Sequence, residues 1–285
     1  MIISVASGKG GTGKTTVAVN LAVSLEDVQL VDCDVEEPNA HLFIQPEITE
    51  KKSAYIPIPE VIDDKCNYCD RCRQVCAYNA IVVIPPRINK KGALLIYPEL
   101  CHGCGACTLL CPQKAMVEVN KEIGIIEIGE KGDLQFIQGK LNIGEAMSPP
   151  VIRQVKKNID TRKTVIIDAP PGTSCPVITA VKGSDFCVLV TEPTPFGLHD
   201  LALTVDVIRE LKVPFGVVIN RSTIGNNQVE NYCKKENIPV LMKIPFDRKI
   251  AEAYSRGTPI VHILPEYKNS FRGLFDTIAM MTQNA

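Results

Sequence analysis

Short apolar runs rich in β-branched residues alternate with amphipathic segments along most of the chain. Runs of this kind are typical of strands buried on both faces of a parallel sheet. The segments between them repeat apolar residues at helical spacing. The predicted strands are residues 2–5, 28–31, 164–167, 186–190, 215–219 and 240–244, and the predicted helices are residues 17–25, 151–158, 198–211, 228–236 and 249–255. This alternation predicts an α/β fold with a doubly wound, mostly parallel sheet.

The middle of the chain breaks this alternation. The composition changes near Lys51, Pro57 and Pro59 interrupt the pattern, and a cysteine-rich stretch follows that ends between residues 119 and 124. Two alternating runs, residues 123–128 and 134–141, come next and are joined by a turn signal that indicates a β-hairpin. We therefore expect the domain boundaries to separate an inserted domain, residues 57–121, from a discontinuous domain made of residues 1–56 and 122–285.

Composition and charge narrow the class of protein. With 285 residues, of which 45% are hydrophobic, the chain can build one large domain or two. A net charge of −1 gives no reason to expect a nucleic acid as partner. No apolar run approaches the roughly 18 residues that span a bilayer, and a predicted strand at residue 2 leaves no room for a signal peptide. We expect a cytoplasmic protein without stable membrane insertion.

A glycine-rich loop follows the first predicted strand. Residues 8–15 read GKGGTGKT, a full match to the phosphate-binding pattern G-x-x-x-x-G-K-[ST], and a helix pattern follows. The glycines let backbone N–H groups converge on a triphosphate, Lys14 would reach its β- and γ-phosphates, and the Thr15 hydroxyl would ligate Mg²⁺. The alternative is a glycine-rich turn without a ligand, which the agreement of strand, loop and helix disfavours. The predicted nucleotide-binding residues here are Gly8, Gly10, Gly11, Thr12, Gly13, Lys14, Thr15 and Thr16.

Eight of the twelve cysteines form two runs of spacing C-x₂-C-x₂-C-x₃-C, offset by 35 residues. This is the bacterial ferredoxin pattern, in which each run gives three thiolates to one [4Fe–4S] cluster and its fourth cysteine to the other. Zinc in two Cys₄ sites is the alternative, but zinc does not require this interleaved pattern twice. The predicted ligands are Cys66, Cys69, Cys72 and Cys111 for one cluster, and Cys101, Cys104, Cys107 and Cys76 for the other. The inserted domain is therefore expected to be an α+β domain of the bacterial ferredoxin kind.

Aspartates follow two of the predicted strands. Asp32 and Asp34 come after residues 28–31, and Asp168 comes directly after residues 164–167. Because ligands bind at the carboxyl ends of the strands in open α/β sheets, we expect these side chains to lie near the phosphate loop. Asp168 has the position of a Walker B-like aspartate, which would hold Mg²⁺ through water.

Two strings carry a resemblance to a known family. Lys9, directly after the first glycine of GKGGTGKT, resembles the deviant phosphate loop of the MinD/ParA and nitrogenase iron-protein superfamily, and DAPPGT at residues 168–173 resembles its Mrp-type members. The resemblance covers essentially the whole chain. It implies a P-loop NTPase fold with an inserted ferredoxin domain, and an ATP-sandwich homodimer in which Lys9 reaches the nucleotide of the partner subunit.

The same resemblance implies roles for further residues. Asp34 would begin switch I and position the attacking water, while Asp32 would support the loop. Backbone N–H groups around Gly172 would sense the γ-phosphate. The residues that would bind adenine are Asn220, Arg221 and Pro245, with Phe246 and Asp247 beside Pro245.

Taken together, the motifs predict slow, partner-stimulated, Mg²⁺-dependent ATP hydrolysis by a protein that carries two [4Fe–4S] clusters. We expect the nucleotide state to control electron transfer to a redox partner, because complete ferredoxin spacing favours permanently held clusters. The alternative is an ATPase that assembles or carries an iron–sulfur or other metal cofactor for a client protein. A DNA- or membrane-positioning ATPase is a third class, which the near-neutral charge disfavours. The predicted catalytic residues are Lys9, Lys14, Asp34 and Asp168.

The remaining cysteines and the C-terminal segment have ordinary structural explanations. Cys33, Cys187 and Cys233 lie in apolar or helical contexts and are expected in the core. Cys175 follows residues 169–173, which resemble the switch II turn of the superfamily. The nitrogenase iron protein has a ligand to a dimer-bridging cluster just after this turn, but no second such cysteine is evident here. Residues 268–283 carry apolar residues at helical spacing and few basic residues, which favours core packing over a membrane-binding helix.

Overall fold

The apolar runs form the centre of a nine-stranded sheet in the structure, a computed structural model that describes residues 1–283. The strand order is β11-β10-β9-β1-β8-β2-β7-β6-β3, and all neighbours from β11 to β7 pair in parallel. The strands are β1 (Ile2–Ser7), β2 (Val28–Asp32), β3 (Glu47–Val61), β6 (Met116–Lys131), β7 (Leu134–Leu141), β8 (Thr164–Pro171), β9 (Phe186–Thr191), β10 (Phe215–Ile219) and β11 (Val240–Lys243). The predicted mostly parallel sheet is confirmed.

The chain divides into two compact units. The first, here called the sheet unit, comprises Met1–Lys52, Ile126–Lys140 and the chain from Ile152 onward. The second, the cysteine unit, comprises Ser53–Ile125 and Leu141–Val151. The division falls within β3, β6 and helix α5 (Pro149–Lys156) and before the last residue of β7, so these elements contribute residues to both units.

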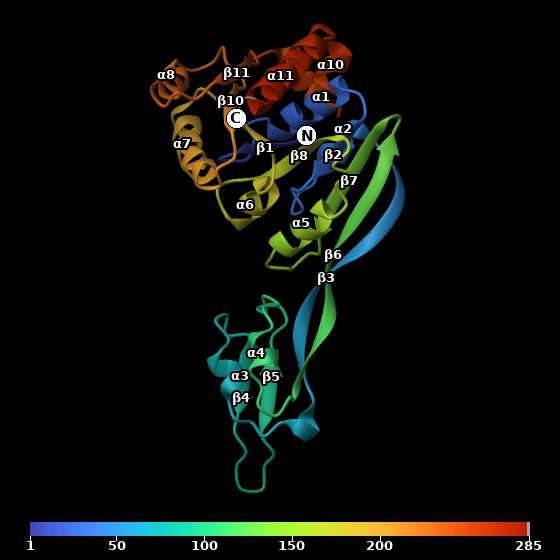
Figure 1. The fold of residues 1–285 in the computed structure, drawn as a ribbon, viewed down its shortest axis with the longest axis vertical. Coiled ribbons are helices and arrows are strands. Elements are labelled where there is room, and N and C mark those ends of the chain that lie inside the picture. The colour runs from blue at the N-terminus through green and yellow to red at the C-terminus, as the bar shows by residue number, and fades with distance from the viewer. Residues whose placement is uncertain (284–285) are drawn as a thin grey trace. The chain divides into compact units, whose positions relative to one another are not determined.

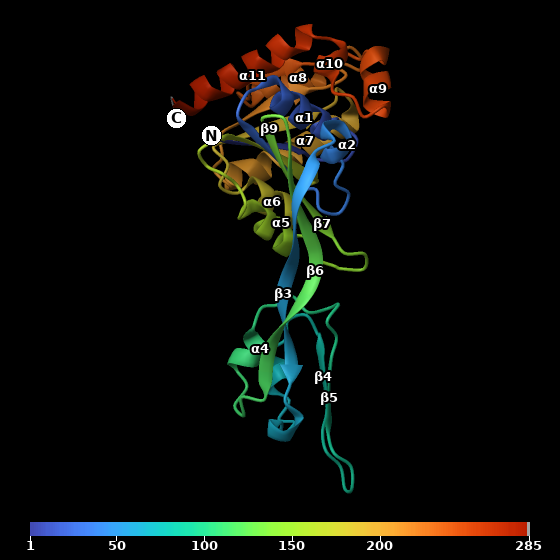
Figure 2. The same ribbon diagram turned by 90° about the vertical axis from the view of Figure 1, so that its right-hand side faces the viewer.

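Helices cover both faces of the sheet, as a parallel sheet requires. On one face α1 packs against α2, α10 and α11, and on the other α6 and α7 pack against the central strands (Figures 1 and 2). Capping explains where α7 begins, because Pro195 occupies its first turn and the Thr194 hydroxyl accepts the Gly197 N–H at 3.0 Å. The helices of this unit are α1 (Lys14–Ser24), α2 (Ala40–Ile44), α6 (Cys175–Val181), α7 (Pro195–Glu210), α8 (Gln228–Lys235), α9 (Arg248–Ser255), α10 (Ile260–Ile263) and α11 (Glu266–Gln283).

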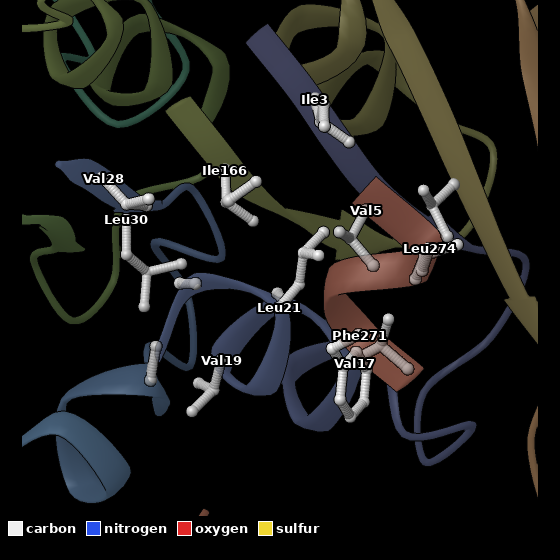
Figure 3. Close-up of a cluster of buried hydrophobic side chains, with 14 of the residues drawn as sticks. Ile3, Val5, Val17, Val19, Leu21, Val28, Leu30, Ile166, Phe271 and Leu274 are labelled. Atoms are coloured by element: carbon white, nitrogen blue, oxygen red, sulfur yellow. The ribbon is translucent and has the colours of Figure 1, made fainter. Parts of the chain in front are cut away.

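The main core lies between the sheet and the layer that contains α1. Ile3 and Val5, alternate residues of β1, belong to the same buried cluster as Leu21 of α1 and Phe271 and Leu274 of α11 (Figure 3). All five side chains are almost completely shielded from solvent. This packing therefore fixes α1, the helix that follows the glycine-rich loop, and with it the position of that loop.

The C-terminal helix α11 packs into this core. Phe271, Leu274 and Ile278 are buried at helical spacing, and the helix contacts α1. The prediction of core packing for residues 268–283 is confirmed. None of the helices described between residues 1 and 283 is both long enough and apolar enough to cross a lipid bilayer.

The cysteine unit is small and built around a hairpin. Strands β4 (Ile81–Ile84) and β5 (Ala93–Ile96) pair antiparallel, with Ile81 opposite Ile96 and Val82 opposite Leu95. Ile81, Cys107 and Met116 form its buried cluster. The remaining elements are a 3₁₀ turn at Asp63–Lys65 and two short helices, α3 (Arg71–Gln74) and α4 (Ala106–Leu109).

Several elements differ from the sequence-based expectation: helices α2, α6 and α10 were not predicted, and three strands of the sheet also differ. Strand β3 was not predicted because Pro57 and Pro59 lack backbone donors, yet a proline is tolerated in an edge strand, and β3 is the edge of the sheet. Strand β6 begins at Met116 rather than at residue 123. Strand β8 continues past Asp168 to Pro171, so the expected turn begins later.

The packing of α11 gives a first prediction. The substitution Phe271→Ala would leave a cavity beside α1 and β1 and lower the free energy of unfolding by about 3–5 kcal/mol. Denaturant titration followed by circular dichroism measures this change. Asp276→Ala, at an exposed position of the same helix, should change stability by less than about 0.5 kcal/mol. Equal effects of the two substitutions would contradict the packing described here.

Candidate functional site

The parallel register of three strands brings the predicted catalytic side chains together. Asp32 at the end of β2 lies opposite Asp168 of β8, and Asp168 lies opposite Val5 of β1. The glycine-rich loop leaves β1 directly after Ser7, and Lys14 is the first residue of α1. The carboxyl ends of β1, β2 and β8 therefore surround one site.

Close approaches inside the protein explain two of the loop glycines. A Cβ at Gly8 would lie 2.4 Å from the carbonyl oxygen of Asp200 in α7. A Cβ at Gly13 would lie 2.3 Å from Asn220 Nδ2, and Gly13 has the left-handed φ of 90°. Asn220 Nδ2 donates to the carbonyl oxygen of Thr12 at 2.8 Å. The loop is thus braced from behind by α7 and by the residue that follows β10.

Lys14 and Thr15 both bind Asp168. The Lys14 Nζ lies 2.5 Å from Asp168 Oδ1, and the Thr15 hydroxyl donates to Asp168 Oδ2 at 2.6 Å. A second carboxylate, Asp34, lies 3.8 Å from Lys14 Nζ. Burial by itself lowers the pKa of Lys14, but the charges of Asp168, Asp34 and Asp32 outweigh burial and raise the pKa above its usual value. Lys14 is therefore a firmly charged ammonium group surrounded by acids.

The two aspartates after β2 differ in their surroundings. Asp32 is fully buried, and its carboxylate accepts backbone N–H groups from Asp34, Asn39 and Ala40 at 3.0, 3.1 and 3.0 Å. Burial and the neighbouring Asp168 raise the pKa of Asp32 to about 7. Asp34 borders the cavity described below, and burial raises its pKa to about 6. Asp32 thus holds the segment between β2 and α2 in place, while Asp34 faces the space in which a ligand can bind.

A cavity of about 390 Å³ opens in front of this cluster. Its wall is formed by the glycine-rich loop together with Asp34, and by Asn220 and the residues after β11. Its predicted lining residues are Lys9, Gly10, Gly11, Gly13, Lys14, Thr15, Thr16, Asp34, Asn220, Arg221, Pro245, Phe246 and Asp247. A wall that combines glycine N–H groups, lysines, an amide and apolar side chains fits a nucleoside polyphosphate.

Sequence reasoning missed part of the cavity wall. Ile250, Ala251 and Tyr254 of α9 line it, as do Glu37 and Asn39 after β2. The helical spacing of Ile250 and Tyr254 predicted a helix, but the same spacing occurs in any helix packed on a core. Only the fold reveals that this helix borders the ligand space.

Some predicted residues lie behind the wall of the cavity rather than in it. Gly8 and Thr12 face the protein, and Asp168 lies beneath Lys14 and Thr15. Gly172 has the left-handed φ of 99°, and its N–H donates to the carbonyl oxygen of Ser7 at 2.8 Å. A γ-phosphate contact by Gly172 would require this hydrogen bond to open, so the sensing role stays a prediction.

Lys9 and Arg221 share one buried carboxylate. Glu192, at the end of β9, is almost fully shielded from solvent, yet its Oε1 lies 2.6 Å from Arg221 Nη1 and its Oε2 lies 3.8 Å from Lys9 Nζ. Both cations line the cavity. Glu192 therefore neutralises positive charge that would otherwise face the ligand. The sequence reasoning did not single out Glu192, because a lone glutamate carries no spacing signal.

In the cysteine unit, each predicted ligand set lines its own cavity. Cys66, Cys69, Cys72 and Cys111 surround one, together with Val83 and Leu94 of the hairpin. Cys76, Cys101, Cys104 and Cys107 surround the other, together with Tyr78 and His102, whose rings stack with centroids 3.5 Å apart. The fourth cysteine of each run therefore lies with the other run.

The two runs also share their backbone conformation. Tyr68 and Asp70 have left-handed φ angles of 56° and 68°, and Gly103 and Gly105, at the corresponding positions of the second run, have 62° and 74°. In both runs backbone N–H groups point at sulfur. The donors are Tyr68 and Ala80 to Cys66 and Cys76, at 3.4 Å each, and Gly103 and Ala115 to Cys101 and Cys111, at 3.4 and 3.2 Å.

This donor set fits iron–sulfur clusters. Thiols that line a common cavity and accept backbone N–H groups suit thiolates bound to iron, because such hydrogen bonds stabilise negative charge on sulfur. All twelve cysteines are free of disulfides, and each set has one exposed cysteine residue, Cys69 or Cys104. Within residues 1–283, no three His, Cys, Asp or Glu side chains are grouped so as to hold a single metal ion.

The other cysteines lie outside these sets. Cys33, Cys187 and Cys233 are buried in the sheet unit, so their predicted place in the core is confirmed. Burial raises the pKa of Cys187 to about 12 and that of Cys233 to about 11, which keeps these thiols protonated and unreactive. Cys175 is exposed at the start of α6.

Comparisons with known proteins agree with this geometry. A family model described as the CobQ/CobB/MinD/ParA nucleotide binding domain matches residues 3–260. An uncharacterized protein of Methanocaldococcus jannaschii is 34% identical over 285 residues, which cover 98% of this chain and 96% of that protein. An iron–sulfur cluster carrier protein of Pyrococcus horikoshii is 26% identical over 279 residues, 91% of this chain and 78% of that protein. Among solved structures, the septum site-determining protein MinD of Pyrococcus horikoshii, complexed with Mg-ADP, aligns with a TM-score of 0.60 and 21% identity, covering 99% of this chain and 98% of that one.

The loop geometry gives a prediction for nucleotide binding. In Gly13→Ala, the added methyl would meet Asn220, and the left-handed φ would cost roughly 1–2 kcal/mol, so the affinity for ATP should fall about tenfold or more. Fluorescent-nucleotide titration measures the change. Gly273→Ala is the control, since Gly273 is an exposed residue of α11 away from the cavity and no protein atom lies within 4 Å of a Cβ there. Comparable losses in both variants would show that the bracing of the loop does not matter.

The shared carboxylate gives a second prediction. Glu192→Gln would remove a buried negative charge beside the cavity and free Lys9 and Arg221 to attract phosphate. We expect ATP to bind roughly three- to tenfold more tightly, with the gain shrinking as salt is added. Calorimetric titration at two salt concentrations tests this. Weaker binding in the variant would mean that Glu192 serves to orient the two cations rather than to neutralise them.

Proposed function

Because this chain belongs to the family of CobQ/CobB/MinD/ParA nucleotide-binding domains and is a P-loop ATPase, we propose that ATP binding and hydrolysis control the delivery of iron–sulfur clusters to a client protein in the cytoplasm. The clusters are then cargo rather than permanent redox centres. The ATPase part rests on the family, and the carrier part rests on the cysteine unit and on relatives that bear the name of such carriers.

The observation that carries the proposal is the exposed cysteine residue in each ligand set. Cys69 and Cys104 are exposed, whereas their neighbours are shielded to different degrees. A ligand that solvent can reach is also one that a client thiolate can replace, so a cluster held in this way can be handed over. Relatives named iron–sulfur cluster carrier protein, 26% and 27% identical over 91% of this chain, support the same function.

The main sequence-based reading, electron transfer to a partner, is less well supported than its alternative. The complete ferredoxin spacing favoured permanent clusters, but spacing determines only which sulfurs can bind iron. It does not determine whether the cluster stays. The relatives that match this chain across most of its length include carriers, and the exposed ligand in each set agrees with release.

At the sheet unit, we assign ATP handling to the residues at the strand ends. Lys14 would exchange Asp168 for the β- and γ-phosphates, while Thr15 and Asp168 would hold Mg²⁺, directly and through water. Bound Mg²⁺ supplies the positive charge that phosphoryl transfer requires. Asp34, at the cavity, would orient the attacking water, and Lys9 would neutralise phosphate charge on the nucleotide of the partner subunit.

The remaining assignments complete the proposal. Gly172 would report the γ-phosphate through its backbone N–H. The chain would act as an ATP-sandwich homodimer, and residues 57–121 would form the inserted two-cluster domain. The residues that would bind adenine are Asn220, Arg221 and Pro245, and those that would hold the cargo are Cys66, Cys69, Cys72 and Cys111, and Cys76, Cys101, Cys104 and Cys107.

Cluster delivery can be measured directly. Protein reconstituted without oxygen should contain about eight irons per chain and should restore activity to an apo-aconitase, faster with ATP than with ADP. The Asp168→Asn variant should keep its iron, but ATP should no longer speed the activation of aconitase. The reason is that Mg²⁺ and Lys14 both lose the carboxylate that binds them. Iron analysis and the rate of aconitase activation are the two readouts.

Matched cysteine variants make the test specific. Cys69→Ser should lower the iron content by about half, since each set would hold four irons, whereas Cys233→Ser, at a buried cysteine of α8, should leave it unchanged. If the clusters stay bound through repeated reduction and oxidation and the acceptor is not activated, the carrier function is refuted and electron transfer becomes the favoured function. Zinc in place of iron would refute both.

A further inference from the structure

The hairpin β4–β5 of the cysteine unit has an unusual outer face. Its inner face, with Ile81, Val83, Leu94 and Ile96, packs into the small core of the unit. The alternate residues point outward, and all of them are apolar. Val82, Ile84, Leu95 and Tyr97, directly after β5, are 38–46% exposed. We call these four residues the hairpin face.

An outward face of this composition is atypical of a free hairpin. An antiparallel sheet with one face on the core usually presents polar side chains to water on the other. Val82 and Leu95 are direct cross-strand partners, so the apolar side chains form a continuous strip rather than isolated positions. Contiguous apolar surface of this kind is characteristic of binding sites.

The tip of the same hairpin is positively charged. Arg87, Lys90 and Lys91 are exposed, and no Asp or Glu occurs from Ile81 to Tyr97. Two backbone hydrogen bonds between Arg87 and Lys90, at 3.1 and 2.9 Å, close the tip and hold these cations together. Lys91 has only a weak exposed contact with Asp63, at 3.7 Å. Ile88 lies among the cations and is 94% exposed.

The hairpin is also the wall of one thiol cavity. Val83 of β4 and Leu94 of β5 line the cavity that Cys66, Cys69, Cys72 and Cys111 surround. A protein seated on the outer face would therefore be separated from that cavity by the hairpin backbone and the inward side chains of Val83 and Leu94. The apolar strip, the charged tip and the thiol set belong to one small structural element.

We propose that the hairpin face and the basic tip dock an acidic client protein, with apolar contact along the strands and carboxylates of the client around Arg87, Lys90 and Lys91. This inference rests on the proposed function, since the client is the recipient of the cluster. Charge complementarity selects an acidic partner, and it speeds association through long-range attraction. An anionic lipid surface is disfavoured, because the apolar side chains run along both strands instead of being confined to the tip.

The experiment uses the apo form of an acidic two-[4Fe–4S] ferredoxin as acceptor and the full-length, cluster-loaded protein as donor. A tip variant, R87E/K90E/K91E, should slow cluster transfer and weaken acceptor binding about tenfold at low salt, and the difference should shrink at high salt. A face variant, I84T/L95T, should weaken both by about tenfold at every salt concentration. Iron content and ATP hydrolysis should match those of the unaltered protein in both variants.

The control variant reverses three exposed lysines of the sheet unit, K157E/K234E/K235E, and should bind and transfer normally. Tip and face variants that bind the acceptor as tightly as the unaltered protein would overturn the docking site. Two further results would also overturn it. In the first, the variants bind the acceptor normally but no longer attach to phosphatidylglycerol vesicles, which would make the surface a lipid-binding site. In the second, they bind the acceptor normally but sediment as monomers where the nucleotide-free unaltered protein is a dimer, which would make the surface a dimer interface. If the unaltered protein binds the acceptor but transfers no cluster, the carrier function fails while the docking surface stands.

Discussion

The nucleotide site depends on the buried ion pair between Lys14 and Asp168. Burying two charges is costly unless the geometry is close and the remaining polar atoms are satisfied. Here the Lys14 Nζ lies 2.5 Å from one carboxylate oxygen, and the Thr15 hydroxyl donates to the other at 2.6 Å. Yet one ammonium faces three carboxylates, and the pKa values of Asp32 and Asp34, about 7 and about 6, reflect that imbalance together with burial. A divalent cation beside Asp168 would correct it, and a phosphate could then replace Asp168 as the partner of Lys14.

Much of this site could be predicted from the sequence, because its motifs are local. The loop of residues 8–15 carries its own ligand pattern, and β7 and β10 have the predicted bounds. What could not be predicted depends on residues distant in the chain. Glu192 matters only because β9 lies next to β1, and Tyr254 only because α9 borders the cavity. Strand β3 was not predicted because its two prolines weaken the sequence pattern of a strand. The structure accepts them because β3 lies at the edge of the sheet, where a missing backbone donor is tolerated.

The cysteine unit shows how little freedom the cluster loops have. Tyr68 and Asp70 adopt left-handed backbone angles that residues with a Cβ seldom take, and the second run uses glycine at both equivalent positions. The first run accepts that conformational strain and still aims the same backbone donor at its first sulfur. A loop that keeps one shape with two different sequences is constrained by what it surrounds. The cysteine spacing predicted the ligand sets, but the positive φ of Tyr68 and Asp70 could not be read from it.

A protein that retains its clusters and one that releases them can use the same eight cysteines at the same spacing. What differs between them is how far solvent can reach the cysteine ligands. A shielded ligand is closed to exchange, whereas an accessible thiolate can be replaced by a thiolate from another protein. In both sets of this protein one cysteine is exposed, although backbone N–H groups donate to other sulfurs of the same sets. The apolar and basic surface of the hairpin lies on the wall of one of these sets. A partner bound to this surface would be held at the element that lines one of the sets, which is the first step that the proposed delivery would require.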